Sequence, residues 1–159
     1  LFYHKQYEYA ILILKKFLEE PDGWIENILN SCLVLSCCYQ AMGENAAAFD
    51  ILFYSFTMDV PRAEICCEIG RLFMEKKEYV TAAYWYQQAL LAPWKRKNGG
   101  FYIADSHDFI PFMQMCVCLD KAGRHREAFE FHKKARALKP LHQAVIGNEK
   151  YFRAVWGME

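Results

Sequence analysis

The sequence predicts an all-α protein, a right-handed α-α superhelix built from stacked helical hairpins. Apolar residues recur at three- and four-residue spacing through most of the 159 residues, which is the period of an amphipathic helix. Glycines and prolines separate these segments, and the alternation typical of strands is nearly absent. Related segments also recur along the chain. Each hairpin buries only one face by itself, so neighbouring hairpins must stack to form a continuous core.

The most regular stretch runs from Arg62 to Pro93. It holds two amphipathic segments separated by E-K-K-E, and Pro93 ends the second. We therefore predict a helical hairpin here. Its apolar positions are Ile65, Ile69, Leu72 and Phe73 in the first segment, and Tyr79, Ala82, Ala83, Tyr86, Ala89 and Leu90 in the second.

The remaining helices follow from the same period and from the residues that interrupt it. Gly43 and Gly123 follow the last turn of two helices, as glycine often does. Residues 94–108 form the one irregular stretch. The predicted helices cover residues 6–19, 24–42, 45–58, 109–121, 125–138 and 141–155. In the first of them, we expect Tyr9, Ala10, Ile13, Leu14 and Phe17 to point inward.

An alanine in the middle of each second helix sets the register of the repeats. Ala10, Ala48, Ala82 and Ala128 are separated by 38, 34 and 46 residues, so the extra residues fall in connections, where insertions cost little. We predict a single domain over residues 1–159. It comprises a half repeat at about 1–22, repeats at about 24–61, 62–93 and 109–140, a capping helix at about 141–156 and an inserted loop at 94–108.

This register resembles the tetratricopeptide repeat, whose signature is W-x-x-L-G-x-x-Y, then A-x-x-x-F, then P. The central unit has Cys66-x-x-Ile69-Gly70-x-x-Phe73, then Ala82-x-x-x-Tyr86 and Pro93. The signature tryptophan is missing from every unit, and His132 stands where an aromatic residue is usual. Small residues at Ser36, Gly70 and Cys116 indicate close helix approach, with Ala48, Ala82 and Ala128 as the small partners across that contact.

Composition disfavours several classes of protein. The formal net charge is zero, whereas nucleic-acid binders usually carry a basic excess. The longest apolar run, Tyr9 to Leu14, is too short to span a bilayer. The seven cysteines lie within helical patterns, which favours reduced thiols in a cytoplasmic protein over disulfides. We expect no cofactor and no zinc site, and the helical pattern at Leu1 suggests a fragment.

Residues 94–108 leave two interpretations open. Asp105, His107 and Asp108 are candidate metal ligands or an acid–base group, or else Ser106 or Asp108 caps the next helix of an ordered loop. The basic run Lys95 to Lys97 either faces solvent or contacts phosphate, and Gly99-Gly100 either permit a turn or cradle phosphate. No known catalytic motif occurs, so we predict no catalytic residue in this chain.

In tetratricopeptide proteins, the first helices of the hairpins line a concave groove that holds peptide ligands. The resemblance therefore implies a binding surface at the off-core positions of these helices, which we call the groove positions. The lysine and asparagine pattern with which chaperone-binding members clamp a terminal carboxylate is missing there. The groove positions are Asn30, Leu33, Cys37, Gln40, Glu64, Cys67, Arg71, Met74, Ile110, Met113, Val117 and Asp120.

The stretch from Cys66 to Phe152 is also similar to repeat regions of bacterial (Firmicutes) family-two glycosyltransferases. The matching features are G-G-F-Y-I-A-D in the loop and N-E-K-Y-F at Asn148 to Phe152. This resemblance implies an assembly module that follows a nucleotide-sugar-dependent catalytic domain and binds a polypeptide or that domain. The alternatives are a free-standing adaptor for an unrelated peptide and, third, an enzyme with its site in residues 94–108.

Overall fold

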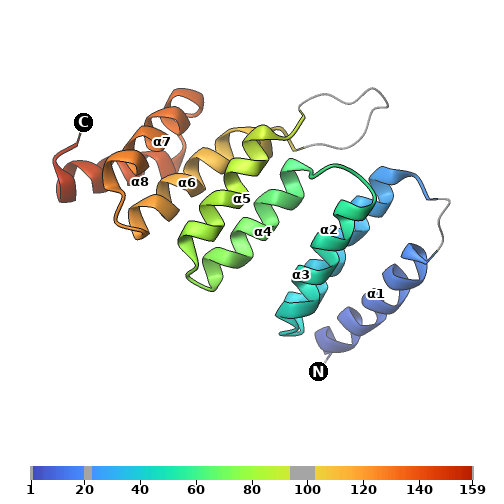
Figure 1. Ribbon diagram of the computed structural model, residues 1–159. Helices are drawn as coiled ribbons and strands as arrows, with labels where there is room; N and C mark the ends of the chain where they lie inside the picture. Colours follow the sequence, from blue (N-terminus) through green and yellow to red (C-terminus); the bar gives the residue numbers. More distant parts are fainter. Residues whose placement is uncertain (1, 20–22, 94–102, 159) are drawn as a thin grey trace. The chain divides into compact units, whose positions relative to one another are not determined.

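The computed structural model describes residues 2–19, 23–93 and 103–158, and this part of the chain folds into helices joined by turns (Figure 1). The all-α fold class is therefore confirmed. Two 3₁₀ helices (η1, Ser55–Thr57; η2, Ala104–His107) and a π-helical turn (η3, Phe152–Trp156) accompany the α-helices. The α-helices are α1 (Phe2–Leu18), α2 (Ile25–Ala41), α3 (Asn45–Tyr54), α4 (Ala63–Glu75), α5 (Tyr79–Leu91), α6 (Phe109–Lys121), α7 (His125–Leu138) and α8 (Gln143–Tyr151).

The described helices fall into two compact units, one running to Pro61 and the other beginning at Arg62. In the first unit, α1 packs on α2, and α2 packs on α3. Among the described residues, no helix has the length and apolar character needed to cross a bilayer.

Helix α1 differs from expectation in what it buries. Ala10, Leu14 and Phe17 are half-buried, but Tyr9 and Ile13 are 66% and 48% exposed. The expectation that these two residues point inward was wrong. The physical reason is that, among the described helices, the main packing partner of α1 is α2, which covers one side of the helix.

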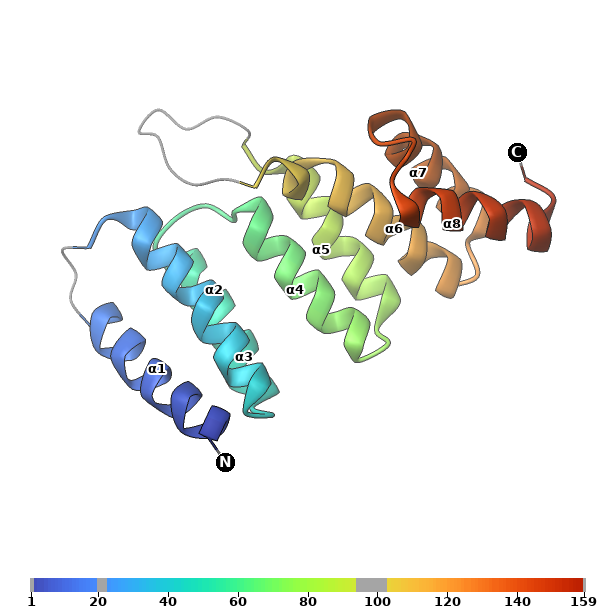
Figure 2. The same cartoon turned by 180° about the vertical axis from the view of Figure 1, so that it is seen from behind.

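In the second unit each α-helix packs on the next, from α4 through α8 (Figure 2). The core between α4, α5 and α6 is built largely from small side chains, which lets the helix axes approach closely. Gly70 marks the tightest approach, because a Cβ atom there would lie 2.9 Å from Cε2 of Tyr86. The predicted close contact at Gly70 is thus confirmed, although the group that meets it is the Tyr86 ring rather than Ala82. Buried members of this core are Ala63, Cys66, Cys67, Ala82, Ala83, Tyr86, Ala89, Ala92, Met115 and Cys118.

The turns inside the three hairpins have the same backbone conformation. Gly43, Lys77 and Gly123 adopt positive φ values of 79°, 60° and 79°. After each, a backbone N–H closes the turn on a carbonyl near the end of the first helix, as in a Schellman motif. Lysine at position 77 therefore occupies a conformation that favours glycine. The closing bonds are Glu44 N to Tyr39 O (2.8 Å), Glu78 N to Phe73 O (2.9 Å) and Arg124 N to Leu119 O (2.8 Å).

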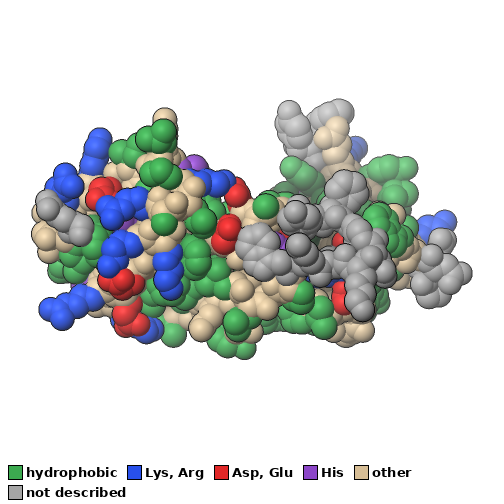
Figure 3. Space-filling view, turned by 90° about the horizontal axis from the view of Figure 1, so that it is seen from above, with side chains coloured by type: hydrophobic (Ala, Val, Ile, Leu, Met, Phe, Trp, Pro, Cys, Tyr) green, Lys and Arg blue, Asp and Glu red, His purple; other side chains and the backbone are tan. Residues whose placement is uncertain are grey.

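Helix α8 is fixed to the rest of its unit by apolar and ionic contacts. Val145 and Phe152 are almost fully buried, in clusters with residues of α6 and α7. Nε2 of the buried His132 lies 2.6 Å from Oε2 of Glu149, and Arg136 donates to Oε1 of Glu149 at 2.7 Å. The hydrogen bond with His132 lowers the pKa of Glu149. Lys and Arg side chains are numerous on the part of this unit formed by α7 and α8 (Figure 3).

Candidate functional site

The groove positions are divided between the two compact units. Four lie on α2 in the first unit, and eight lie on α4 and α6 in the second. On α2, Asn30 and Cys37 are exposed, while Leu33 and Gln40 are half-buried. Gln40 donates a hydrogen bond of 3.1 Å to Ser36 Oγ. The eight positions on α4 and α6 lie within one unit and can be described together.

The end of the inserted stretch covers the N-terminal half of α4. Oε1 of Glu64 accepts a hydrogen bond of 2.8 Å from the backbone N–H of Ile103, and Sγ of Cys67 donates to the carbonyl of Ser106 at 3.5 Å. His107 is buried, with Nε2 3.9 Å from Oε1 of Glu64. Two groove positions are therefore occupied by the chain itself. The sequence alone did not show this, because the contacting residues are 39 positions apart.

The polar residues of η2 and its flank have structural roles. Asp108 caps α6 by accepting from the backbone N–H of Phe109, which confirms the capping interpretation for this residue. Asp105 forms an ion pair with Lys139. Within residues 2–19, 23–93 and 103–158, no group of three or more His, Cys, Asp and Glu side chains is arranged to hold a metal ion. The runs Lys95 to Lys97 and Gly99-Gly100 lie outside the described residues.

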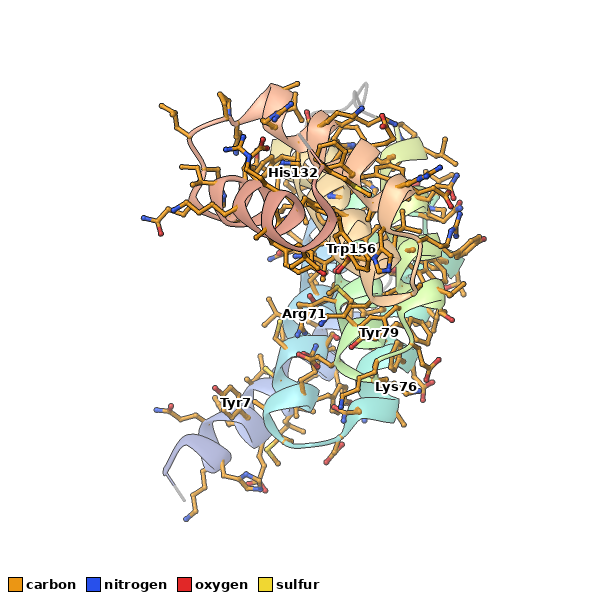
Figure 4. All side chains as sticks on the ribbon, turned by 90° about the vertical axis from the view of Figure 1, so that its left-hand side faces the viewer. Tyr7, Arg71, Lys76, Tyr79, His132 and Trp156 are labelled. Atoms are coloured by element: carbon orange, nitrogen blue, oxygen red, sulfur yellow. The ribbon has the colours of Figure 1, made fainter. Side chains whose placement is uncertain are left out.

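The C-terminal half of α4 carries an ionic group around Arg71, the residue labelled in Figure 4. Its guanidinium donates to both carboxylate oxygens of Glu68, at 2.9 and 2.6 Å, and also to Glu75. These carboxylates raise the pKa of Arg71. One positive charge thus lies between two negative ones, so this group does not attract a terminal carboxylate. Beside it, Sδ of Met74 accepts a hydrogen bond of 3.6 Å from the Tyr86 hydroxyl.

The groove positions of α6 differ in how much they expose. Met113 is only 7% exposed and packs with Phe109, Ala135 and Val145. Ile110 and Val117 are half-buried. Asp120 accepts from Nδ1 of His125 at 2.7 Å and from the Tyr151 hydroxyl at 2.8 Å. Of the eight positions on α4 and α6, those that keep a half-buried side chain and are not contacted by residues 103–107 are Arg71, Met74, Ile110, Val117 and Asp120.

A hollow with a volume of about 350 Å³ lies between α5, α6 and α7, apart from the groove positions. Val80 and Tyr84, both well exposed, line it together with Phe131. This hollow was not predicted from the sequence. The aromatic run at 84–86 was the available signal. The full lining is Val80, Ala83, Tyr84, Gln87, Met115, Leu119, Arg124, Glu127 and Phe131.

Another hollow, with a volume of about 500 Å³, lies at the start of α7. Arg124, His125, Arg126 and Trp156 contribute to its wall. The His125 ring stacks on the Trp156 indole with 3.7 Å between ring centroids. Arg124 is also paired with Glu127 at 2.6 Å, which offsets part of the positive charge.

The cysteines do not form a reactive centre. Burial raises the pKa of Cys32 to about 11 and the pKa values of Cys66, Cys116 and Cys118 to about 12. A thiol with such a pKa stays protonated near neutral pH and is a poor nucleophile. Cys37 is the exposed cysteine.

Comparison with known proteins supports the fold. A scan against protein families finds no match, and neither does a search of curated proteins. A search of solved structures finds the crystal structure of MamA, with a TM-score of 0.67 and 20% sequence identity, over 94% of this chain and 80% of MamA. This likeness concerns the fold alone. The helix order, the hairpin turns and this match together show that the chain has a tetratricopeptide-like helical-repeat fold.

Proposed function

We propose that this chain is a protein-interaction module that binds a short polypeptide segment on the open part of its first helices. The supporting observation is that Met74 on α4 and Val117 on α6 keep half-buried apolar side chains, and that the ion-paired Arg71 on α4 is also only half-buried. The segment from Ile103 to His107 covers Glu64 and Cys67, so the ligand contacts the C-terminal half of α4.

The charges on this surface suggest the chemistry of the ligand. Glu68 and Glu75 flank Arg71, and Asp120 on α6 accepts hydrogen bonds from two neighbours. The surface therefore suits a ligand with an apolar side chain near a lysine or arginine, and does not depend on a free C-terminal carboxylate. Electrostatic complementarity of this kind selects the partner more than it sets the affinity.

A peptide library displayed on phage and selected on the 159-residue chain tests this function. Selected peptides are expected to share an apolar residue next to a basic one. A synthetic peptide with such a sequence is expected to bind equally well with a free or an amidated C-terminus. Replacing Val117 by Glu should weaken binding at least about tenfold, because it places a charge among apolar contacts.

The matched control is Leu91→Glu, a substitution at an exposed apolar position of α5 that lies outside the groove positions. It should leave peptide binding unchanged. If the library yields no binder, or if both variants bind as the unchanged chain does, the assignment of this surface is incorrect.

We further propose a narrower role, based on the sequence resemblance. In this narrower role, the module follows a family-two glycosyltransferase domain in the same polypeptide, and it binds either a polypeptide acceptor or that domain. The competing role is a free-standing adaptor. The residues encoded ahead of Leu1 distinguish them: a strand–helix pattern containing D-x-D supports the transferase, and further repeats alone contradict it.

A further inference from the structure

Helix α1 carries an uncovered face on the side away from α2. Its centre is Leu12, which is 64% exposed, with Tyr9 and Ile13 on one flank. At about 100° per residue, Lys5, Glu8, Lys16 and Glu19 all lie within about 40° of the direction of Leu12. All of these residues are exposed. We call this set the α1 stripe.

The charges of the α1 stripe follow a self-complementary order. Along the helix, the stripe reads positive at Lys5, negative at Glu8, apolar at Leu12, positive at Lys16 and negative at Glu19. When a second copy of the helix runs antiparallel with Leu12 opposite Leu12, Lys5 faces Glu19 and Glu8 faces Lys16. In a parallel arrangement, every charge instead faces its own kind.

No other contact in the described chain uses these charges. Lys5, Glu8, Lys16 and Glu19 have no ion-pair partner within residues 2–19, 23–93 and 103–158. The exposed apolar residues of α5, which include Val80, Tyr84 and Leu91, have no comparable charged neighbours at helical spacing. Exposed apolar residues therefore occur on both helices, but the alternating charges belong to α1.

We propose that the α1 stripe is a self-association surface that pairs two copies of this chain as an antiparallel, two-fold symmetric helix pair. A two-fold interface places the same patch on both partners, and the stripe meets this requirement with Leu12 on the axis. Each copy contributes one half of both ion-pair types, which gives four interchain ion pairs around the apolar centre. This surface is separate from the groove positions.

The size of the surface sets the expected affinity. Helix α1 has 17 residues, which corresponds to a length of about 25 Å. One helix pair of this length falls at or below the low end of stable protein interfaces, about 1,200 Å² of total buried surface. The dissociation constant is therefore expected to be on the order of 10–100 µM, and to rise with salt because exposed charges contribute.

Charge reversal tests the antiparallel register. Sedimentation equilibrium of the 159-residue chain, from about 5 to about 500 µM at low salt, should show a monomer–dimer equilibrium. Glu8→Lys or Lys16→Glu alone turns two attractive contacts into repulsive ones and should raise the dissociation constant about tenfold. The double variant E8K/K16E should dimerise as the unchanged chain does. An equimolar mixture of the two single variants should form a heterodimer, since both contacts are then restored.

Two further variants locate the surface. Leu12→Glu brings two carboxylates together on the two-fold axis and should abolish the dimer, while Leu91→Glu should have no effect. Circular dichroism should be the same for all variants, because the substituted side chains are exposed. A chain that stays monomeric at about 500 µM overturns the proposal and leaves this face to a helix of another polypeptide. So does a double variant that is as weak as the single variants, or a dimer that tolerates Leu12→Glu.

Discussion

Helices α1 and α5 occupy the same register in the repeat but bury very different amounts of surface. Ala82 and Tyr86 of α5 are essentially inaccessible, whereas the equivalent Ala10 and Leu14 of α1 are half-buried. Among the described helices, α5 packs against both α4 and α6, while the main packing partner of α1 is α2. Burial in a helical repeat is therefore set by the number of neighbouring helices, not only by the pattern of the helix itself.

The largest expected effect comes from truncating the equivalent side chains of the two helices. Tyr86→Ala should lower the free energy of unfolding of its unit by about 3–5 kcal/mol, because a large buried side chain leaves a cavity. Leu14→Ala should cost only about 1 kcal/mol, since its side chain is half-buried. Urea denaturation followed by circular dichroism measures both. Equal losses would contradict the role given to neighbouring helices.

Gly70 and Gly147 both lie in helices, but a methyl group added at each position would meet different surroundings. Gly70→Ala should destabilise the chain by about 1–3 kcal/mol, because the new methyl group meets the Tyr86 ring. Gly147→Ala in α8 should stabilise it by about 0.5–1 kcal/mol, because no atom lies near the new methyl group and alanine favours the helix. Thermal unfolding of the two variants should shift in opposite directions. A shift in the same direction would show that the Gly70 contact is not tight.

Helix α8 differs from α1 and α5 because charged side chains contribute to its attachment to the neighbouring helix. Glu149 bonds His132 and Arg136, and the pKa of its carboxyl group is lowered in the fold. A carboxyl group whose folded pKa lies below its unfolded value stabilises the fold above the unfolded pKa, about 4.3, and loses this effect as pH falls through the folded pKa. Glu149→Gln should therefore cost about 1–2 kcal/mol at pH 7, and progressively less at more acidic pH.

The measurement is urea denaturation at several pH values between about 3 and 7. The control is Asp50→Asn on α3, an exposed residue without an ion-pair partner in the described chain, which should have almost no effect at any of these values. A constant loss for Glu149→Gln over the whole range would show that its charge does not matter.

The smallest expected effect concerns the hairpin turns. Lys77→Gly should stabilise the chain by up to about 1 kcal/mol, because glycine adopts positive φ without the steric cost that lysine has there. Gly123→Lys, the reverse change in the next hairpin, should destabilise by a similar amount. Differential scanning calorimetry of the two variants measures both shifts. An unchanged Lys77→Gly variant would indicate that the loss of flexibility on folding cancels the gain.

The sequence predicted what depends on local spacing. The bounds of α6 and α7 were predicted to the residue, and the close approach at Gly70 followed from its place in the repeat. The exposure of Tyr9 and Ile13 could not be predicted from α1, because it depends on which helices lie beside it. The hydrogen bond from the backbone N–H of Ile103 to Glu64 could not be predicted either, because the sequence around each residue does not specify a contact 39 positions away.

The contact between Glu64 and Ile103 also bears on ligand affinity. The segment from Ile103 to His107 belongs to the same polypeptide as the surface it covers, so it acts as a tethered competitor at high effective concentration. A polypeptide that needs Glu64 or Cys67 must first displace it. The apparent affinity of such a polypeptide is then its intrinsic affinity multiplied by the fraction of molecules in which the segment has left this surface. A ligand confined to Arg71, Met74 and Val117 is free of this competition.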